Sequence, residues 1–410
     1  MEKEPLPKQP ELNLGTLGHV DNGKSTLVQA LAGVWTAKHS EELRRGITIR
    51  VGYADVGIYR CLKGRGYCTS EKCPECNSRT KFVRGISFVD CPGHHSLMVT
   101  MLSGAALMDG ALLVLSADKK CPQPQDREHL AAAEIADIDK ILIVQNKIDL
   151  ITQEQARDNF KEIEMFVKGT VAEKAPVIPV SAQHSINLEL LIENVEKHIP
   201  TPKRDLSKPP KMLIVRSFDV NKPGTDAEKL VGGVIGGSIL EGVFSVGDEI
   251  EISPGLRVET KGKIHYGPLF TKIESLTAGG KFVEKAQCGG LVGVGTHLDP
   301  SLTRADGLVG NVVGKPNHLP PVLNNLTFEP HLFKQVIGTE ELLKVEKVKT
   351  NENLVVNIGT AVSSGVVKSA RRDIVEMTLR RSVLAEKKTR VAISRRIGDS
   401  WRLIGYGIVK

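Results

Sequence analysis

Up to about Ile199, short apolar runs alternate with segments of helical spacing. The runs are rich in β-branched residues, which is typical of strands buried on both faces. They are Leu12–Leu17, Ser87–Asp90, Ala111–Ser116, Ile141–Gln145 and Val177–Val180. Between them, Gln123–Ile135 and Gln153–Gly169 show helical periodicity. This alternation predicts an α/β fold with a doubly wound, mostly parallel sheet, whose ligands bind beyond the carboxyl ends of the strands.

The pattern changes after a Pro-bracketed segment. Pro200-Thr201-Pro202 and Pro209-Pro210 enclose a charged stretch that reads as a linker. Beyond it, helical spacing nearly disappears, and short alternating runs punctuated by Gly, Pro and Asn predict all-β barrels. A second break is expected near His318–Pro321. We therefore expect three domains, at residues 1–205, 206–321 and 322–410.

Composition is that of an ordinary globular protein, with 40% hydrophobic and 25% charged residues among 410. No run approaches the roughly 20 apolar residues of a membrane helix, and no signal-peptide core opens the chain, so we expect a cytoplasmic protein. The formal charge is +7, and from Pro321 to Lys410 there are 16 Lys and Arg against 9 Asp and Glu. This basic excess indicates either nucleic-acid contact or an ordinary solvated face.

Gly18–Ser25, with the sequence GHVDNGKS, fits the phosphate-binding pattern G-x-x-x-x-G-K-[ST]. The required context is present, because an apolar strand precedes the loop and a helix is expected from about Ser25 to Ala32. Backbone N–H groups of such a loop and the following helix N-terminus bind phosphate. Lys24 is expected at the β- and γ-phosphates and Ser25 on Mg²⁺.

Two further motifs follow predicted strands. Asp90-Cys91-Pro92-Gly93 has the form D-x-x-G, in which the carboxylate reaches the magnesium shell and the glycine N–H senses the γ-phosphate, although alone this pattern also suits a plain turn. Asn146-Lys147-Ile148-Asp149 places a carboxylate that can accept two hydrogen bonds from guanine, which adenine cannot supply. Ser181-Ala182-Gln183 would complete the base pocket. Together these elements predict a GTP-binding switch protein.

At these residues the chain resembles the translational GTPases, the group that contains elongation factor Tu. The likeness is carried by GHVDNGKST, RRGITI, DCPGH, NKID and SAQ. Within that group it resembles the gamma-subunit family of archaeal and eukaryotic initiation factor 2, through HSEELRRGITI, KPPKMLIVRSFDVNKPGT, GGLVGVGT and WRLIGYGI. The resemblance implies a GTPase domain followed by two β-barrels.

The resemblance also implies roles for individual residues. Thr48 corresponds to the switch threonine that ligates Mg²⁺ with Ser25, and Asp21 with the Gly46 carbonyl to a second magnesium site. His94 stands where the family's water-positioning histidine does, and it acts there with Asp90 and Gly93; a lone histidine also suits a surface or capping role. Nucleotide contacts are expected from Asp21, Asn22, Gly23, Lys24, Ser25, Thr26, Asn146, Lys147, Asp149, Ser181, Ala182 and Gln183. Asn22 departs from the family's usual histidine but lies away from Lys24 and Ser25, so nucleotide binding is expected to survive. The resemblance also implies a low intrinsic GTPase rate, because the family relies on a separate activating protein or on the ribosome.

Four cysteines crowd into an insertion at about residues 58–82, which in a cytosolic chain indicates a metal more than disulfides. Cys73-Pro74-Glu75-Cys76 is a two-residue-spaced zinc knuckle. The family pattern would place a second C-x-x-C at Cys61, but Gly64 stands where its partner is expected, and Cys68 is the candidate replacement. Zinc on all four thiolates, a three-ligand or weak site, and free thiols remain the alternatives.

The resemblance implies GTP-dependent binding of methionylated initiator tRNA, its delivery to the small ribosomal subunit, and release on GTP hydrolysis. It also implies alpha and beta partner subunits in a heterotrimer. Candidate phosphate contacts in the basic C-terminal part are Arg371, Arg372, Arg380, Arg381, Lys387, Lys388, Arg395 and Arg396. The rival interpretations are a selenocysteine-type elongation factor and a nucleotide-binding scaffold with negligible GTP turnover.

Overall fold

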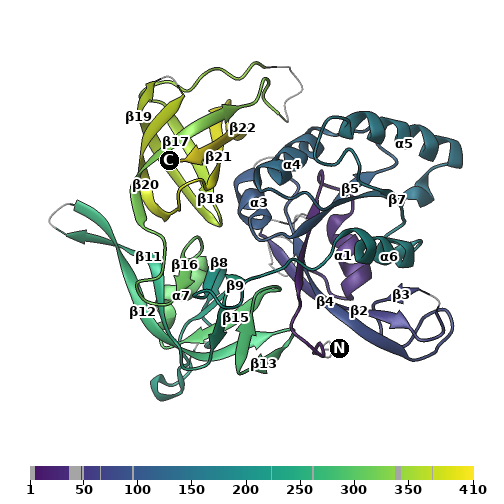
Figure 1. The fold of residues 1–410 in the computed structure, drawn as a ribbon, viewed down its shortest axis with the longest axis horizontal. Coiled ribbons are helices and arrows are strands. Elements are labelled where there is room, and N and C mark those ends of the chain that lie inside the picture. Colours follow the sequence, from purple (N-terminus) through teal and green to yellow (C-terminus); the bar gives the residue numbers. More distant parts are fainter. Residues whose placement is uncertain are drawn as a thin grey trace.

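The computed structural model describes residues 5–36, 48, 50–64, 66–94, 97–222, 224–260, 263–337, 343–371 and 373–410. An α/β domain lies beside two β-barrels, which are stacked one above the other in Figure 1. The expected fold class is confirmed. Within the part of the chain that is described, no helix is long and apolar enough to cross a membrane.

The first domain is built on a seven-stranded sheet with the order β3-β2-β4-β1-β5-β6-β7. Its strands are β1 (Leu12–Leu17), β2 (Gly52–Cys61), β3 (Tyr67–Cys68), β4 (Thr80–Asp90), β5 (Gly110–Ser116), β6 (Ile141–Asn146) and β7 (Val177–Pro179). Strands β1, β4, β5, β6 and β7 pair in parallel. Every residue of β1, β5 and β6 is buried, which explains their continuous apolar runs.

Helices cover both faces of this sheet (Figure 1). They are α1 (Lys24–Ala32), α3 (Met98–Ala105), α4 (Pro124–Ile135), α5 (Gln153–Val167) and α6 (Leu188–His198). Leu27 of α1 and Leu191 of α6 belong to one hydrophobic core, while α3, α4 and α5 contribute to the other. Helix α1 is bounded by Gly23 and Gly33, both in the left-handed region that glycine tolerates.

Strands β2 and β3 and the first half of β4 are absent from the strands predicted above. β2 pairs antiparallel with β4, and β3 extends this pairing at the sheet edge. The outer part of β4 alternates between exposed and half-buried residues, so it lacks the continuous apolar run of a strand buried on both faces. The hairpin carries the cysteine-rich insertion at its tip.

The second domain is a closed antiparallel barrel. Strands β8, β9, β15, β12, β11 and β16 follow one another, and β11 pairs with β12 to close the ring. The bounds are β8 (Lys211–Phe218), β9 (Val234–Glu241), β11 (Glu249–Thr260), β12 (Lys263–Ala278), β15 (Val292–Thr296) and β16 (Val312–Gly314). Smaller elements are β10 (Val243–Ser245), β13 (Lys281–Val283), β14 (Lys285–Gln287) and α7 (Pro300–Thr303), with 3₁₀ turns at Ala227–Lys229 and Arg304–Asp306 and, in the first domain, at Ile148–Leu150.

The third domain is also a closed barrel, with the order β17-β20-β19-β18-β21-β22 and pairing between β17 and β22. Its strands are β17 (Val322–Leu332), β18 (Asn353–Ile358), β19 (Ala361–Arg371), β20 (Ile374–Leu384), β21 (Arg390–Ile397) and β22 (Ser400–Val409). The alternation of buried and exposed residues along β20 is that of a strand with one face in a barrel core and one in solvent.

Specific contacts join the domains. Asp109, between α3 and β5, receives two hydrogen bonds from Arg204 in the linker, at 2.6 and 2.7 Å. The N-terminal segment bonds to the second domain, through Leu6 N–H to the Gly279 carbonyl at 2.9 Å. The third domain packs beside α3 and α4, where Arg390 reaches Asp137 at 3.1 Å (Figure 1).

Candidate functional site

The loop between β1 and α1 curls around the Lys24 ammonium. Gly18, Asp21 and Gly23 adopt φ of 129°, 65° and 90°, which turns successive peptide units around a concave surface. The Lys24 Nζ donates to the carbonyl oxygens of Gly18 and His19, at 2.8 Å each. Lys24 is buried, and burial lowers the pKa of its ammonium. The loop therefore presents one positive group from inside the fold, while Asp21 faces solvent.

Hydroxyl groups converge on the Asp90 carboxylate at the end of β4. Ser25 Oγ and Thr36 Oγ1 each donate to Oδ2 at 2.6 Å, and Thr16 Oγ1 donates to Oδ1 at 2.8 Å. Thr48 Oγ1 lies 2.9 Å from Ser25 Oγ. The two hydroxyls predicted to bind Mg²⁺ thus lie in contact, beside the predicted carboxylate. Gly46, predicted for a second magnesium, lies outside the described residues.

The loop after β4 lies against the phosphate loop. A Cβ on Gly93 would lie 2.8 Å from the Val20 nitrogen and 2.4 Å from Lys24 Nζ, so this approach requires glycine. His94 follows at a half-buried position, and its carbonyl accepts the Leu97 N–H at 2.9 Å. Burial lowers the pKa of His19, with smaller contributions from the Lys24 and His94 charges.

The base-recognition motif is tied to both neighbouring loops. Asn146 Nδ2 donates to the Asn22 carbonyl at 2.9 Å, and its Oδ1 accepts the Ala182 N–H at 3.0 Å. A hydrogen bond from the Ser181 hydroxyl holds the pKa of the Asp149 carboxyl below its ordinary value. Asp149 therefore stays ionised and able to accept two N–H donors.

Two other members of the predicted set are Lys147, within this motif, and Gln183, in the loop after β7. Lys147 has the left-handed φ of 65°, and its Nζ lies 3.9 Å from Asp118 Oδ1. Gln183 is exposed, so its predicted contribution to the base pocket is through its backbone.

Two residues of α4 contact the phosphate loop from behind, and the sequence did not predict them. Asp126 Oδ1 accepts the His19 N–H at 2.7 Å and Asn22 Nδ2 at 3.1 Å. His129 Nδ1 accepts the Gly18 N–H at 3.0 Å. Both side chains are buried, Asp126 at 1% exposure and His129 at 0%. Their spacing of three positions, one helical turn, was the available signal.

The tip of the β2–β4 hairpin gathers three thiols. The sulfurs of Cys61, Cys73 and Cys76 all lie within 4.8 Å of one another, and those of Cys61 and Cys76 are 3.6 Å apart. Ser78 Oγ lies 3.3 Å from the Cys61 sulfur and 2.9 Å from the Cys76 sulfur. Cys68, the predicted fourth ligand, lies outside this group, and its sulfur donates to the Ser70 carbonyl at 3.3 Å.

The position of Cys68 follows from strand pairing. It lies on β3 opposite Tyr59, whereas Cys61 is two residues further along β2. The pairing that anchors β3 sets the Cys68 backbone beside Tyr59 rather than beside the knuckle. The remaining cysteines, Cys91, Cys121 and Cys288, are buried.

Two of the basic residues considered for phosphate contact are engaged in contacts within the protein. Arg381 donates to the Val309 carbonyl of the second domain at 2.7 Å, and Arg395 pairs with Glu352. The exposed ones are Arg371, Arg380, Lys387, Lys388 and Arg396. Arg372 lies outside the described residues.

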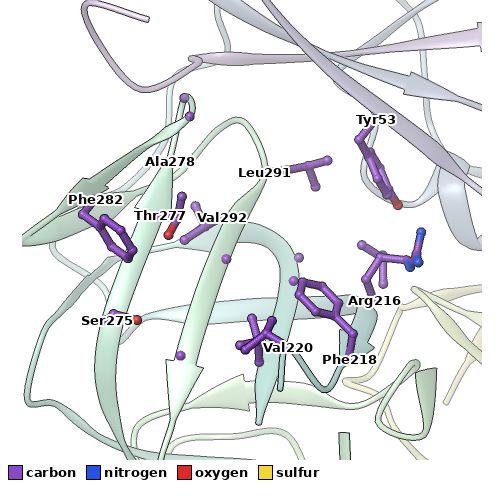
Figure 2. A pocket seen from close by; sticks show the side chains of 18 of the residues that line it. Tyr53, Arg216, Phe218, Val220, Ser275, Thr277, Ala278, Phe282, Leu291 and Val292 are labelled. Atoms are coloured by element: carbon purple, nitrogen blue, oxygen red, sulfur yellow. The ribbon is translucent and has the colours of Figure 1, made fainter. Parts of the chain in front are cut away.

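A cavity of about 790 Å³ opens between the first and second domains. Figure 2 shows Tyr53 of β2 facing the barrel across this space, with Arg216 and Phe218 of β8 below it. Val292 and Thr277 form part of the barrel wall, which also includes several glycines, so the wall is largely apolar and backbone-rich. Such a surface suits a ligand whose planar or apolar group packs against the exposed main chain of the barrel.

Comparison with known proteins places these features in a family. The Elongation factor Tu GTP binding domain matches residues 9–201, and the C-terminal domain of initiation factor eIF2 gamma matches residues 324–409. Translation initiation factor 2 subunit gamma of Pyrococcus horikoshii is 58% identical over 403 residues, covering 98% of each chain. The corresponding subunit of Methanocaldococcus jannaschii is 55% identical over 410 residues, covering 100% of each.

Solved structures show the same fold at low sequence identity. A bacterial selenocysteine-specific elongation factor EF-Sec superposes with a TM-score of 0.74 at 21% identity, over 98% of this chain and 58% of that one. Elongation factor SelB from Methanococcus maripaludis, in complex with a GTP analogue, gives 0.72 at 20% identity, over 99% and 80%. These likenesses concern the fold alone. The identity to the initiation-factor subunits over nearly the whole length is decisive: the chain belongs to the gamma-subunit family of translation initiation factor 2.

Proposed function

We propose that this chain is a GTP-gated carrier that binds methionylated initiator tRNA, brings it to the small ribosomal subunit and releases it on GTP hydrolysis. Family membership supports the role in initiation. The observation that carries the gating is the contact of Ser25 with Thr48, 2.9 Å apart beside Asp90. Thr48 comes from the segment before β2, so a ligand shared by both hydroxyls would hold that segment against the phosphate loop.

The hydroxyl pair fits a magnesium ion. Neighbouring ligands of an octahedral ion with bonds of about 2.1 Å lie roughly 3 Å apart, close to the separation of Ser25 Oγ and Thr48 Oγ1. A bound Mg²⁺ would neutralise charge on the β- and γ-phosphates. Asp90 would act on its hydration shell, and Asp21 with the Gly46 carbonyl is proposed for a second ion. Lys24 and the N–H groups from Gly23 to Thr26 would hold the phosphates.

For hydrolysis, we assign positioning of the attacking water to His94 and sensing of the γ-phosphate to the Gly93 N–H. Both come within four residues after Asp90, and Gly93 lies against the phosphate loop. Catalysis in this class is mostly positioning and electrostatics, so the rate depends on how His94 is oriented. We propose a GTPase of the protein-synthesis type with a low intrinsic rate. Guanine selectivity is assigned to Asp149, with Asn146, Lys147 and the Ser181–Gln183 loop.

The cavity between the first two domains is proposed to hold the aminoacylated 3′ end of the tRNA. Its largely apolar wall suits a methionyl side chain, and Tyr53 and Phe218 offer aromatic faces for a base. Tyr53 is five residues after Thr48, so a ligand bound at Thr48 would act close to one wall of the cavity. The exposed basic residues of the third domain are candidate phosphate contacts.

The three-thiol group is proposed to hold zinc. Two thiolates about 2.3 Å from one tetrahedral ion lie roughly 3.8 Å apart, near the 3.6 Å between the Cys61 and Cys76 sulfurs. Cys73 would supply the third ligand. Cys68 would complete four thiolates only by leaving the Ser70 carbonyl, whereas Ser78 already touches two of the sulfurs. Such a site would be structural, fixing the hairpin tip.

By family resemblance we propose that the chain works in the cytoplasm in a heterotrimer with alpha and beta subunits. The deciding experiment compares the affinity for initiator and elongator methionyl-tRNA in the GTP and GDP states. We expect preference for initiator tRNA, and for GTP over GDP. Equal affinity for both tRNAs would reject the initiation role and leave a general carrier; tRNA binding that ignores the nucleotide, without hydrolysis on ribosomes, would leave a scaffold.

A further inference from the structure

One peptide unit of the phosphate loop connects Lys24 to a carboxylate on α4. The carbonyl of Gly18 accepts a hydrogen bond from Lys24 Nζ at 2.8 Å. The N–H of the same peptide unit, on His19, donates to Asp126 Oδ1 at 2.7 Å. Because the N–H and C=O of a planar peptide point in opposite directions, a partner on one side fixes the direction of the other.

The carboxylate is itself held firmly. Its Oδ2 accepts the Gln123 N–H at 2.8 Å, at the start of α4. Its Oδ1 also accepts Asn22 Nδ2, and that amide donates to the Val114 carbonyl of β5 at 2.8 Å. Asp126 is 1% exposed, so these hydrogen bonds are shielded from water and stronger than they would be at the surface.

The charge of Asp126 also reaches Lys24. Burial lowers the pKa of the Lys24 ammonium, and the carboxylates of Asp90 and then Asp126 are the largest opposing influences. Asp90 acts from the side where the hydroxyls gather, and Asp126 acts from behind the loop. The preceding peptide is held in the same manner, because its Gly18 N–H donates to His129 Nδ1.

We propose that Asp126 is a positioning residue of the nucleotide site, which orients the Gly18–His19 peptide so that its carbonyl holds the Lys24 ammonium ready for the β-phosphate. The inference rests on the proposed nucleotide site. Asp126 reaches the nucleotide site through the phosphate loop, by way of the His19 N–H toward Lys24 and by way of the Asn22 amide. Asn22 shares this carboxylate and takes part in the same support.

A double-mutant cycle tests this dependence. The dissociation constant for GDP is measured by fluorescence titration for the natural chain, Asp126→Ala, Lys24→Ala and the double variant. We expect Asp126→Ala to weaken GDP binding about tenfold, the scale of one hydrogen bond to a charged group. In the Lys24→Ala background the same change is expected to alter the affinity less than about twofold.

Matched variants complete the test. Asp126→Asn keeps an oxygen that can accept the His19 N–H and is expected to recover most of the affinity. Asp139→Ala, an exposed carboxylate between α4 and β6, serves as a control and is expected to bind GDP as the natural chain does. Should Asp126→Ala unfold, as judged by circular dichroism, Asp126→Asn is carried through the same cycle with a smaller expected factor.

The outcomes distinguish failure of the Asp126 inference from failure of the proposed nucleotide site. Equal weakening by the Asp126 change in both backgrounds, or none in either, overturns the positioning role. If Lys24→Ala itself leaves GDP affinity unchanged, the proposed nucleotide site is wrong. Loss of affinity with Lys24→Ala alone, and none with Asp126→Ala, rejects this inference while keeping the site.

Discussion

Glu128 of α4 and Arg402 of β22 form an ion pair between the first and third domains, with 3.0 Å between Arg402 Nη1 and Glu128 Oε1. The Glu128 side chain is completely buried and that of Arg402 is 14% exposed. Burial raises the pKa of the Glu128 carboxyl to about 7, and Arg402 opposes this shift only in part. The two domains are thus joined through a carboxylate that takes up a proton near neutral pH.

This pair predicts a pH dependence of stability. Between pH 4.5, the ordinary pKa of the group, and about 7, the unfolded chain has released the Glu128 proton while the folded chain keeps it. The folded state then binds more protons, so this group makes the free energy of unfolding fall as pH rises through that window, by up to about 3 kcal/mol. Urea unfolding of Glu128→Gln and the natural chain at pH 5 and pH 7.5 measures this. Identical pH dependence in both proteins would contradict it.

Base selectivity is expected to follow Asp149. Asp149→Asn replaces a carboxylate, which accepts two hydrogen bonds, by an amide with one acceptor and one donor. The amide NH₂ would face the amino group of guanine, which is unfavourable, but it can donate to the carbonyl that xanthine has at the same position. We expect GTP affinity to fall about a hundredfold and affinity for xanthosine triphosphate to rise. Competition binding with both nucleotides measures the change. An unaltered ratio of the two affinities would show that another residue reads the base.

Thr48 is expected to matter for GTP and little for GDP. Thr48→Ala removes a hydroxyl that lies against Ser25. In the proposed switch, this hydroxyl ligates Mg²⁺ only when the γ-phosphate is present. We expect GTP affinity to fall about tenfold, GDP affinity to change less than about twofold, and ribosome-stimulated hydrolysis to decrease. An equal loss of affinity for GTP and GDP would show that Thr48 supports the structure of the loop and does not distinguish the two nucleotides.

The inter-domain cavity can be filled from one position. A Cβ on Gly293 of β15 would meet only Thr277 Cβ within 4 Å, at the ordinary distance of 3.7 Å, so Gly293→Leu is expected to fold and project into the cavity. We expect binding of methionyl-tRNA to weaken about tenfold or more while GDP affinity is unchanged. Gly293→Ala is the matched control. Undiminished tRNA binding in Gly293→Leu would remove the cavity from the tRNA site.

Metal content distinguishes the cysteines. Serine substitution of Cys61, Cys73 or Cys76 is expected to abolish stoichiometric zinc, because each removes one of three clustered ligands. Cys68→Ser is expected to retain zinc, and Ser78→Cys to bind it more tightly. Elemental analysis of the purified proteins, before and after dialysis against a chelator, gives the answer. Loss of zinc from Cys68→Ser would show that Cys68 is a fourth ligand and that all four thiolates bind the ion.

The motifs at strand ends were predictable, because parallel strands bring their carboxyl ends to one edge of a sheet. Ser25, Asp90 and Asn146 each follow or end a strand of this kind, and the structure places them around one loop. Asp126 and His129 were not predictable in the same way. Near the start of a helix, a polar side chain is usually interpreted as a solvated or capping group, and only the packing of α4 against the phosphate loop shows otherwise.

The arrangement of the cysteine insertion could be predicted from the sequence only in part. Cys73 and Cys76 are linked by their short spacing, but the partners of Cys61 and Cys68 depend on how β3 pairs with β2. Spacing alone carries no information about that pairing. The edge hairpin itself has exposed alternate residues and therefore lacked the continuous apolar run by which the central strands were recognised.

Asn146 joins the Asn22 carbonyl of the phosphate loop to the Ala182 N–H of the loop after β7, so this one side chain holds the two halves of the proposed site at a set separation. Little conformational entropy is then lost when guanine and phosphates are engaged together. Association is expected to be limited by diffusion and orientation, and differences between nucleotides to appear mainly in their residence times. The rigidity of this one amide bridge would thus influence the residence time of the bound nucleotide.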